Sequence, residues 1–378
     1  MKIAIVVRLL WPGGVQRVAI EEARGLQRLG HHVLLLFLRR SSLPCDYFLQ
    51  DLTYRIADEG CRSNDLARLL FRYFTHIYAP QRGPQATVDL DLIISESLRL
   101  RGFNAVIFHD QFAGIGGLVR KILQGEPYYL YIYETLLSKP HLQPKFMLPF
   151  ALEREVLRGA KFVFTNSKAN AEALRRVTKN VEILYQGCYP KPIEMIDNTK
   201  KDKIALSVAL WDFGRKPDVY LEIAKRLNVG RLILAGSWVD SKQERAFREL
   251  VKKEGVRNLE VTGPISEKVL NELYLKSRAF IRFGFHELGF GQGCLEAISF
   301  GLPIVTNRGF GISEIIIDGV HGYVFDKIDY DLIAEKVKVL LTNDEIFESM
   351  KLNVIKLSNN LSWSNHVRKL NRILLQTK

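Results

Sequence analysis

The sequence is poor in cysteine and has no long apolar run, and both absences exclude classes of protein. Its 378 residues include four cysteines, Cys45, Cys61, Cys188 and Cys294, and none has CxxC or Cys/His metal-ligand spacing. We therefore expect unpaired thiols, a reducing compartment and no metal site. No segment approaches the roughly 20 apolar residues of a membrane span, and the apolar start of the chain is too short for a signal peptide. These absences predict a cytoplasmic protein.

The charge of the chain is more unusual than its hydrophobicity. Hydrophobic residues make up 47% and charged residues 25%, as in soluble globular proteins, but the net charge is +13. A positive excess indicates an anionic partner such as a nucleotide, a lipid phosphate, a membrane surface or a nucleic acid. The alternative is simply a soluble basic surface. Nucleic-acid binding ranks low because the sequence has no nucleic-acid motif and no basic low-complexity tail.

Short apolar runs alternate with segments of helical period, the pattern of parallel α/β domains. In the first half the predicted strands are 3–7, 32–38, 105–109, 128–133, 162–165 and 181–185, and the helices 15–29, 92–100, 114–123, 149–158 and 169–177. In the second half the strands are 204–210, 232–235, 259–262, 279–283, 303–306 and 322–325, and the helices 217–227, 243–253, 267–275, 332–341 and 366–375. The pattern predicts two Rossmann-like, doubly wound domains that face an inter-domain cleft.

The domain boundaries follow from one stretch without periodicity. Residues 188–203 contain two prolines and a charge run, and we interpret them as a linker between domains at 1–187 and 204–355, followed by a C-terminal helical segment at 356–378. The signal is poorer from 43 to 101. There a predicted amphipathic helix at 66–78, with arginines among its apolar residues, is either a core helix or a membrane-surface helix.

Residues 284–304, GFHELGFGQGCLEAISFGLPI, combine glycines, carboxylates and an apolar helix face. The glycines let a ligand approach the backbone, and the helix that follows presents unpaired N–H groups and the positive end of its dipole to an anion. Glu296 lies one turn inside that helix, and Glu287 lies in the loop before it. The alternative is a glycine-rich turn that caps a core helix.

Other candidate residues follow strands of the predicted sheets. Arg215 and Lys216 come after the first strand of the second half, where two cations can bracket a diphosphate, although an exposed basic turn is the alternative. Gly13 and Gly14 follow the first strand of the chain without the GxGxxG fingerprint, and they are equally well explained as a tight turn. His109 ends a strand at a ligand-binding edge or is structural.

Together these residues resemble a known family, the retaining GT-B glycosyltransferases of the family 4 type, also called glycosyl transferases group 1. The resemblance covers nearly the whole chain. It is strongest over 261–326, where FHELGFGQGCLEAISFGLPIV and GISEIIIDGVHGYVF stand in the family's order, and over GGVQR at 13–17. It implies an acceptor-binding N-terminal domain, a nucleotide-sugar-binding C-terminal domain, and a last helix that crosses back to the first domain.

The resemblance also implies the roles of the candidate residues. The donor is a UDP- or GDP-sugar, no further cofactor is needed, and the acceptor is a glycan, a lipid-linked molecule or a small molecule. Glu296 holds the ribose, Glu287 holds sugar hydroxyls, and His109 touches the transferred sugar. The catalytic set is His109, Arg215, Lys216 and Glu287. The donor-binding set is Gly13, Gly14, Gly263, Ile265, Phe290, Gly291, Gln292, Gly293 and Glu296.

Family members of this kind react on one face of the sugar without an enzymic nucleophile, usually without metal. Two departures stand out here. Eight residues separate Glu287 from Glu296 where the family has seven, so that Leu288 occupies the expected position, and Trp211 stands where the family commonly has an arginine. A degenerate sugar-nucleotide-binding subunit that assists an active enzyme is therefore the alternative function. The basic N-terminal domain allows peripheral contact with the inner membrane surface.

Overall fold

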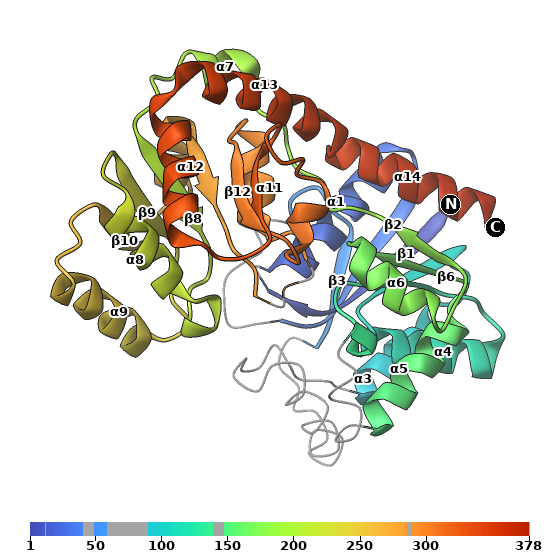
Figure 1. Ribbon diagram of the computed structural model, residues 1–378. Helices are drawn as coiled ribbons and strands as arrows, with labels where there is room; N and C mark the ends of the chain where they lie inside the picture. Colours follow the sequence, from blue (N-terminus) through green and yellow to red (C-terminus); the bar gives the residue numbers. More distant parts are fainter. Residues whose placement is uncertain are drawn as a thin grey trace. The chain divides into compact units, whose positions relative to one another are not determined.

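The computed structural model describes residues 1–11, 13–40, 49–58, 90–138, 147–285, 287 and 289–377. The predicted helix at 66–78 and the position of Leu288 lie outside these ranges. The chain forms two compact units, one made of Met1–Gln186 with Trp363–Lys378 and the other of Gly187–Ser362 (Figure 1). No helix among the described residues is long and apolar enough to cross a bilayer.

The first unit is built on a seven-stranded parallel sheet in the order β3-β2-β1-β4-β5-β6-β7. The strands are β1 Lys2–Leu10, β2 His32–Arg40, β3 Tyr54–Asp58, β4 Ala105–His109, β5 Tyr129–Ile132, β6 Phe162–Thr165 and β7 Val181–Ile183. All except β3 were predicted from their apolar runs. β3 escaped prediction because its YRIAD sequence mixes polar and apolar residues and pairs only at the sheet's edge.

Helices cover both faces of this sheet. They are α1 Gly14–Arg28, α3 Leu90–Arg99, α4 Ala113–Gln124, α5 Met147–Gly159, α6 Lys168–Arg175 and α14 Trp363–Gln376. Alternate residues of β1 enter two different cores: Ile3 and Ile5 pack with α1 and α14, and Ala4 packs with the core on the other face. α1 and α14 lie side by side (Figure 1). The last helix of the chain therefore completes the core of the first unit.

The second unit is built on a six-stranded parallel sheet in the order β10-β9-β8-β11-β12-β13. The strands are β8 Ile204–Val208, β9 Arg231–Ala235, β10 Leu259–Gly263, β11 Ala279–Ile281, β12 Ile304–Asn307 and β13 Gly322–Phe325. The helices are α7 Ile193–Asp197, α8 Pro217–Arg226, α9 Ser241–Lys253, α10 Glu267–Lys276, α11 Gln292–Ser299, α12 Tyr330–Thr342 and α13 Asp344–Asn360. In this order β8 lies beside β11, and a ligand-binding edge is expected where their carboxyl ends meet.

The stretch interpreted as a linker, 188–203, belongs to the second unit and contains α7, which the sequence analysis did not predict. The backbone of Cys188 forms an isolated parallel β-bridge with that of Ser362. The ammonium of Lys351, on α13, lies 2.8 Å from a carboxylate oxygen of Asp197. A helix of five residues is too short to show a period. α13 was also not predicted, and the C-terminal segment at 356–378 comprises the end of α13, a break at Leu361 and Ser362, and α14.

Candidate functional site

In the second unit, the loops after β8 and β11 bring the predicted cationic and acidic residues to one edge of the sheet. The two strands are parallel neighbours, with Ala279 in register with Ala205 and Phe280 with Leu206. Their carboxyl ends therefore point the same way, and the chain after each strand emerges at the same edge. Arg215 and Lys216 follow β8, and Glu287 follows β11.

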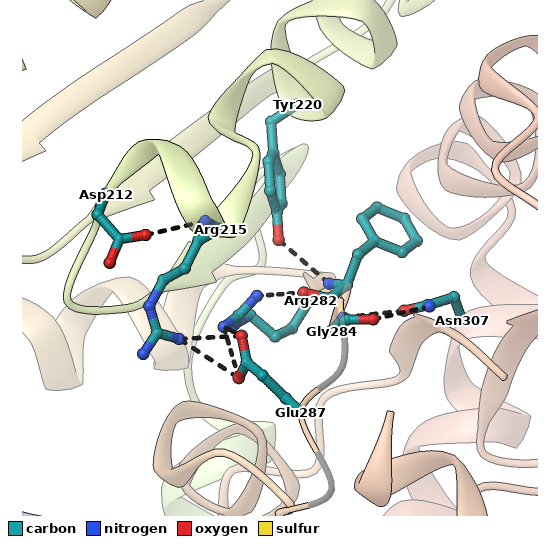
Figure 2. A network of polar contacts seen from close by, with 8 residues as sticks. Asp212, Arg215, Tyr220, Arg282, Gly284, Glu287 and Asn307 are labelled. Atoms are coloured by element: carbon teal, nitrogen blue, oxygen red, sulfur yellow. Dashed lines mark hydrogen bonds and ion pairs between the residues drawn. The ribbon is translucent and has the colours of Figure 1, made fainter. Parts of the chain in front are cut away.

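Glu287 lies between two arginines (Figure 2). Its carboxylate oxygens accept hydrogen bonds from Nη2 of Arg282 at 2.9 and 3.1 Å. They also accept bonds from Nη1 of Arg215, both at 3.4 Å. The sequence analysis did not identify Arg282 as a site residue. The feature that could have identified it is a single arginine directly after a buried strand. The structure thus brings Arg215 and Glu287 into contact and adds Arg282 as a third charged residue beside them.

Arg282 is buried, and its surroundings keep it charged. Burial alone would lower the pKa of its guanidinium, but Tyr220 and Glu287 outweigh that effect and raise the pKa above its ordinary value. Its guanidinium also donates to the carbonyl of Phe283 and lies 5.4 Å from the centre of the Phe310 ring. The guanidinium of Arg282 therefore stays positively charged at this edge of the sheet.

Lys216 is placed by a strained turn. Its φ of 48° and ψ of 63° put it in the left-handed region, where a side chain with a β-carbon is disfavoured. Asp212 stabilises the turn by accepting the N–H of Arg215 at 2.9 Å, and Pro217 starts α8 directly afterwards. The ammonium of Lys216 lies 4.4 Å from the centre of the Phe285 ring, a cation–π contact.

The glycines before α11 have two separate structural reasons. Gly291, with a φ of 72°, is the N-cap of the helix and needs the left-handed freedom of glycine. Gly293 is instead required by packing, because a β-carbon there would lie 2.8 Å from the carbonyl oxygen of Val208 at the end of β8. Gly293 thus holds the first turn of α11 close against the sheet, where its N–H groups and dipole favour an anion.

Glu296 is held by a buried tyrosine. The hydroxyl of Tyr274, on α10, donates to Oε2 of Glu296 at 3.0 Å and lies 3.3 Å from the carbonyl oxygen of Gly293. Burial, followed by the charge of Glu296, raises the pKa of Tyr274 well above its ordinary value, so that it stays a donor. The carboxylate is half-buried and oriented. Only the fold could show that Tyr274 is its partner, because the two residues are on different helices.

The predicted base-binding loop lies at the end of β10. Gly263 adopts a φ of 71°, and a β-carbon there would approach Oε1 of Glu244 at 3.1 Å. Ile265 is half-buried, in the turn before Ser266, which caps α10 by accepting the N–H of Val269. β10 is separated from β8 by β9. These two residues therefore lie two strands away from the Arg215 turn, along the same edge of the sheet.

In the first unit, Gly13 and Gly14 lie at the start of α1, shortly after β1. Gly13 is the N-cap with an extended backbone, and a β-carbon on it would lie 2.8 Å from Oε1 of Gln16 and 2.8 Å from the Trp11 ring. The side chain of Gln16 donates to the carbonyl of Leu9 at 2.8 Å. Gly13 therefore leaves room for the side chains of Trp11 and Gln16 at the start of α1.

His109 ends β4, next to β1, but its ring has no exposed surface. Nδ1 lies 2.7 Å from the hydroxyl of Tyr133, and Nε2 lies 3.1 Å from Oε2 of Glu22 on α1. The other oxygen of Glu22 lies 2.9 Å from Nε2 of His366 on α14, whose Nδ1 donates to the carbonyl of Tyr185. The expected sugar contact needs an accessible ring, whereas this histidine is part of a buried network.

Glu22 is the acid at the centre of that network. Burial alone would raise its pKa, but His109 and His366 outweigh it and lower the pKa to about 2. Glu22 is therefore ionised between two imidazoles at neutral pH. The place of Glu22 in this network was not predicted, because the sequence shows it only as one of two adjacent glutamates in a helix.

The residue after His109 is also strained. Asp110 has a φ of 85°, and its Oδ1 accepts the N–H groups of Phe112 and Ala113 at 2.9 and 2.8 Å. Its other oxygen accepts a hydrogen bond from Nε of Arg8 at 2.7 Å. Asp110 thus caps the start of α4 and ties it to β1. Among the residues that the structure describes, no group of three His, Cys, Asp or Glu side chains is arranged to hold a metal ion.

Comparison with known families assigns both halves of the chain. Residues 13–183 match the family described as glycosyl transferase 4-like domain, and residues 193–357 match glycosyl transferases group 1. Among curated proteins, the uncharacterized glycosyltransferase MJ1178 of Methanocaldococcus jannaschii is 19% identical, with 86% of this chain and 90% of that protein covered. The 2-deoxystreptamine N-acetyl-D-glucosaminyltransferase of Niallia circulans is 29% identical over 35% of this chain and 33% of its own.

Solved structures agree with this assignment at the level of the fold. Anabaena Alr3699/HepE in complex with UDP has a TM-score of 0.79 at 14% identity, with both chains fully covered. WaaG, described as a glycosyltransferase involved in lipopolysaccharide biosynthesis, has a TM-score of 0.68 at 17% identity, with 98% of this chain and 99% of WaaG covered. The likeness confirms the predicted fold class of two Rossmann-like parallel-sheet domains.

Proposed function

This chain is a GT-B glycosyltransferase made of a glycosyl transferase 4-like domain and a glycosyl transferases group 1 domain, and from that premise we propose a specific reaction. The protein transfers a hexosyl unit from a nucleotide-diphosphate sugar to a hydroxyl of a glycan, lipid-linked or small-molecule acceptor, with retention of configuration. One arrangement carries the proposal: Arg215 and Lys216 follow β8, and the first turn of α11 packs against the end of β8 at Gly293.

In this proposal the second unit binds the donor. Arg215 and Lys216 neutralise the diphosphate, and the backbone from Phe290 to Gly293 supplies N–H groups at the start of α11. Glu296, oriented by Tyr274, accepts hydrogen bonds from the ribose hydroxyls. Gly263 and Ile265 contact the base of the nucleotide. UDP is the first nucleotide to test, with GDP the second, because the structural neighbour Alr3699/HepE is described in complex with UDP and with UDP-glucose.

The proposed reaction depends on stabilising the negative charge that develops on the departing diphosphate, and it uses no enzymic nucleophile. The bond between the anomeric carbon and the diphosphate oxygen breaks, and the electron pair stays on the diphosphate, where the two cations and the helix dipole stabilise it. The acceptor hydroxyl forms its bond on the face that the diphosphate leaves, and its proton passes to a diphosphate oxygen. We propose that the first unit binds the acceptor, near Gly13 and Gly14.

The role of His109 is adjusted in this proposal. Its ring lies beneath the surface, with Glu22 on one side and Tyr133 on the other. We therefore assign it to positioning the end of β4 rather than to direct contact with the sugar. Asp110, which follows it, fixes the start of α4.

The experiment measures sugar release and transfer from UDP-glucose, UDP-galactose, UDP-N-acetylglucosamine and GDP-mannose. We expect turnover with one of these donors, and a fall of at least about tenfold in Lys216→Gly and Glu296→Ala, since each removes a hydrogen bond that involves a charge. Lys268→Ala, at an exposed lysine of α10, is the matched control. Full activity in both site variants would contradict the assignment of the site.

A second candidate function is a degenerate subunit that binds sugar nucleotides and assists an active enzyme. The observation in its favour is that the carboxylate of Glu287 is already engaged by two arginines. Calorimetry separates the two functions: nucleotide binding together with transfer identifies an enzyme. Micromolar binding without turnover on any acceptor extract identifies the assisting subunit.

A further inference from the structure

Arg282 presents an electrostatic problem that the fold must solve locally. Its side chain is 3% exposed, directly after β11, in the middle of the second unit's sheet. A buried guanidinium without a counter-ion is strongly unfavourable. Glu287 is that counter-ion, and its two carboxylate oxygens accept hydrogen bonds from the same nitrogen of Arg282. The two residues are only five positions apart in the sequence.

The two arginines hold Glu287 unequally. Charge-assisted N–H···O bonds are normally about 2.7–2.9 Å long, and the bonds from Arg282 come close to that range at 2.9 and 3.1 Å. The bonds from Arg215 are both 3.4 Å, and Arg215 is 23% exposed. Arg215 is therefore the looser and more accessible partner. Figure 2 shows the side chain of Arg215 reaching the carboxylate from the loop after β8.

We propose that Glu287 is the fixed counter-ion of Arg282 and holds Arg215 beside the phosphate site until a diphosphate replaces the carboxylate as the partner of Arg215. This inference rests on the proposed function and deepens it. Arg282 and Glu287 become positioning residues, and the anionic ligand and Glu287 compete for one guanidinium. A sugar-binding role for Glu287 is then unnecessary.

The inference also accounts for the spacing of the two glutamates. A carboxylate at 287, one residue before the position that the family's spacing predicts, faces an arginine that the buried end of β11 places there. The backbone supports the same arrangement, because the N–H of Gly311 donates to the carbonyl of Glu287 and Asn307 bonds Gly284 in both directions. The additional residue between Glu287 and Glu296 and the buried Arg282 thus belong to one structural arrangement.

The first test needs no ligand. Urea unfolding is followed for Arg282→Met, Glu287→Gln and the double variant, with Glu260→Gln as the control, because Glu260 also lies 3.4 Å from an arginine but on the exposed surface. We expect each single change at the pair to lower the urea midpoint. The double variant should lose clearly less than the sum of the two, since the buried guanidinium of Arg282 is then not left without its counter-ion. Additive losses would overturn the proposal.

The second test measures competition. Binding of inorganic pyrophosphate, UDP and UDP-glucose is measured by calorimetry in wild type and in Glu287→Gln. We expect all three affinities to rise by the same factor, about two- to fivefold, the range of a partly exposed ion pair. In an Arg215→Gln background the same change should give no increase beyond that of Glu260→Gln.

The opposite results are equally distinct. Unchanged or lower pyrophosphate affinity in Glu287→Gln overturns the competition, and a loss confined to UDP-glucose makes Glu287 a sugar ligand instead. If wild type binds none of UDP, GDP and their sugars, the proposed donor fails. The unfolding cycle still decides whether Arg282 and Glu287 are coupled.

Discussion

Two residues with a left-handed backbone conformation lie at the sheet edges where the candidate sites are found, one in each unit. Lys216 and Asp110, with φ of 48° and 85°, are non-glycine residues in a region that costs such residues on the order of 1–3 kcal/mol. Each follows a central strand of its sheet, and each has a specific side-chain role: Asp110 caps α4, and Lys216 is a candidate phosphate ligand. Strain of this kind persists where the side chain is needed at that position.

Lys216 allows the backbone and the charge to be tested separately. Lys216→Gly should keep the left-handed turn and raise the urea midpoint slightly, whereas Lys216→Ala should leave the strain in place. Both should weaken UDP binding by about 10- to 100-fold, the usual effect of removing a hydrogen bond to a charge. Calorimetry and urea unfolding of the two variants check this. Equal UDP affinity in wild type and Lys216→Gly would remove Lys216 from the site.

Glu153 predicts a measurable pH dependence of stability. Burial raises the pKa of this carboxyl on α5 to about 7, although the N–H of Leu136 donates to it and opposes the shift. Because the folded state holds the proton more tightly, the free energy of unfolding should fall as pH rises from about 4.5 to about 7, by roughly 3 kcal/mol. Glu153→Gln should lose that slope. Glu155→Gln, an exposed neighbour on the same helix, should keep it.

At the scale of the element, α11 illustrates two opposed effects of glycine. In a helix, replacing glycine by alanine normally gains up to about 1 kcal/mol. At Gly293, however, the new β-carbon would lie 2.8 Å from the carbonyl oxygen of Val208 and 3.2 Å from the Phe280 ring. Since the first contact is with backbone, α11 itself must move. The contact should therefore outweigh the gain in helix propensity.

Gly293→Ala should accordingly destabilise the second unit and weaken diphosphate binding together, because the first turn of α11 moves away from β8. Overpacking of this kind typically costs about 1–3 kcal/mol. Urea unfolding and pyrophosphate calorimetry on the same samples test the link. A stabilised variant with unchanged pyrophosphate binding would show that this close packing is dispensable.

At the scale of the whole molecule, the end of the chain stabilises its beginning. Five residues of α14 enter the core that β1 and α1 share: Trp363, Val367, Leu370, Ile373 and Leu374. Gly25 on α1 makes room for them, since a β-carbon there would lie 2.4 Å from the Val367 side chain. The first unit is therefore incomplete until the last residues of the chain are present.

Leu370→Ala should destabilise the first unit by about 2–5 kcal/mol, the usual cost of a cavity at a fully buried leucine. Leu375→Ala, on the exposed side of the same helix, should have little effect. Limited proteolysis and calorimetry should show earlier unfolding confined to fragments from Met1–Gln186. Equal stability of Leu370→Ala and wild type would contradict this role of α14.

The sequence by itself determined the α/β alternation and most strand positions, including β4 and β6 to the residue. Those follow from local patterns, because a strand buried on both faces is a continuous apolar run. It also determined the glycine-rich start of α11. β3, α7 and α13 were not predicted, since edge pairing, short length and packing against other helices leave little local signal.

Only the tertiary structure decided which charges meet. The contacts of Arg215 with Glu287, of Tyr274 with Glu296, and of Glu22 with both His109 and His366 join residues that lie far apart in the sequence or on different elements. Burial and Coulomb interaction depend on distances in space, which the order of residues along the chain does not specify. The predicted edge of the second sheet was therefore visible in the sequence, whereas the partners of its charged residues were not.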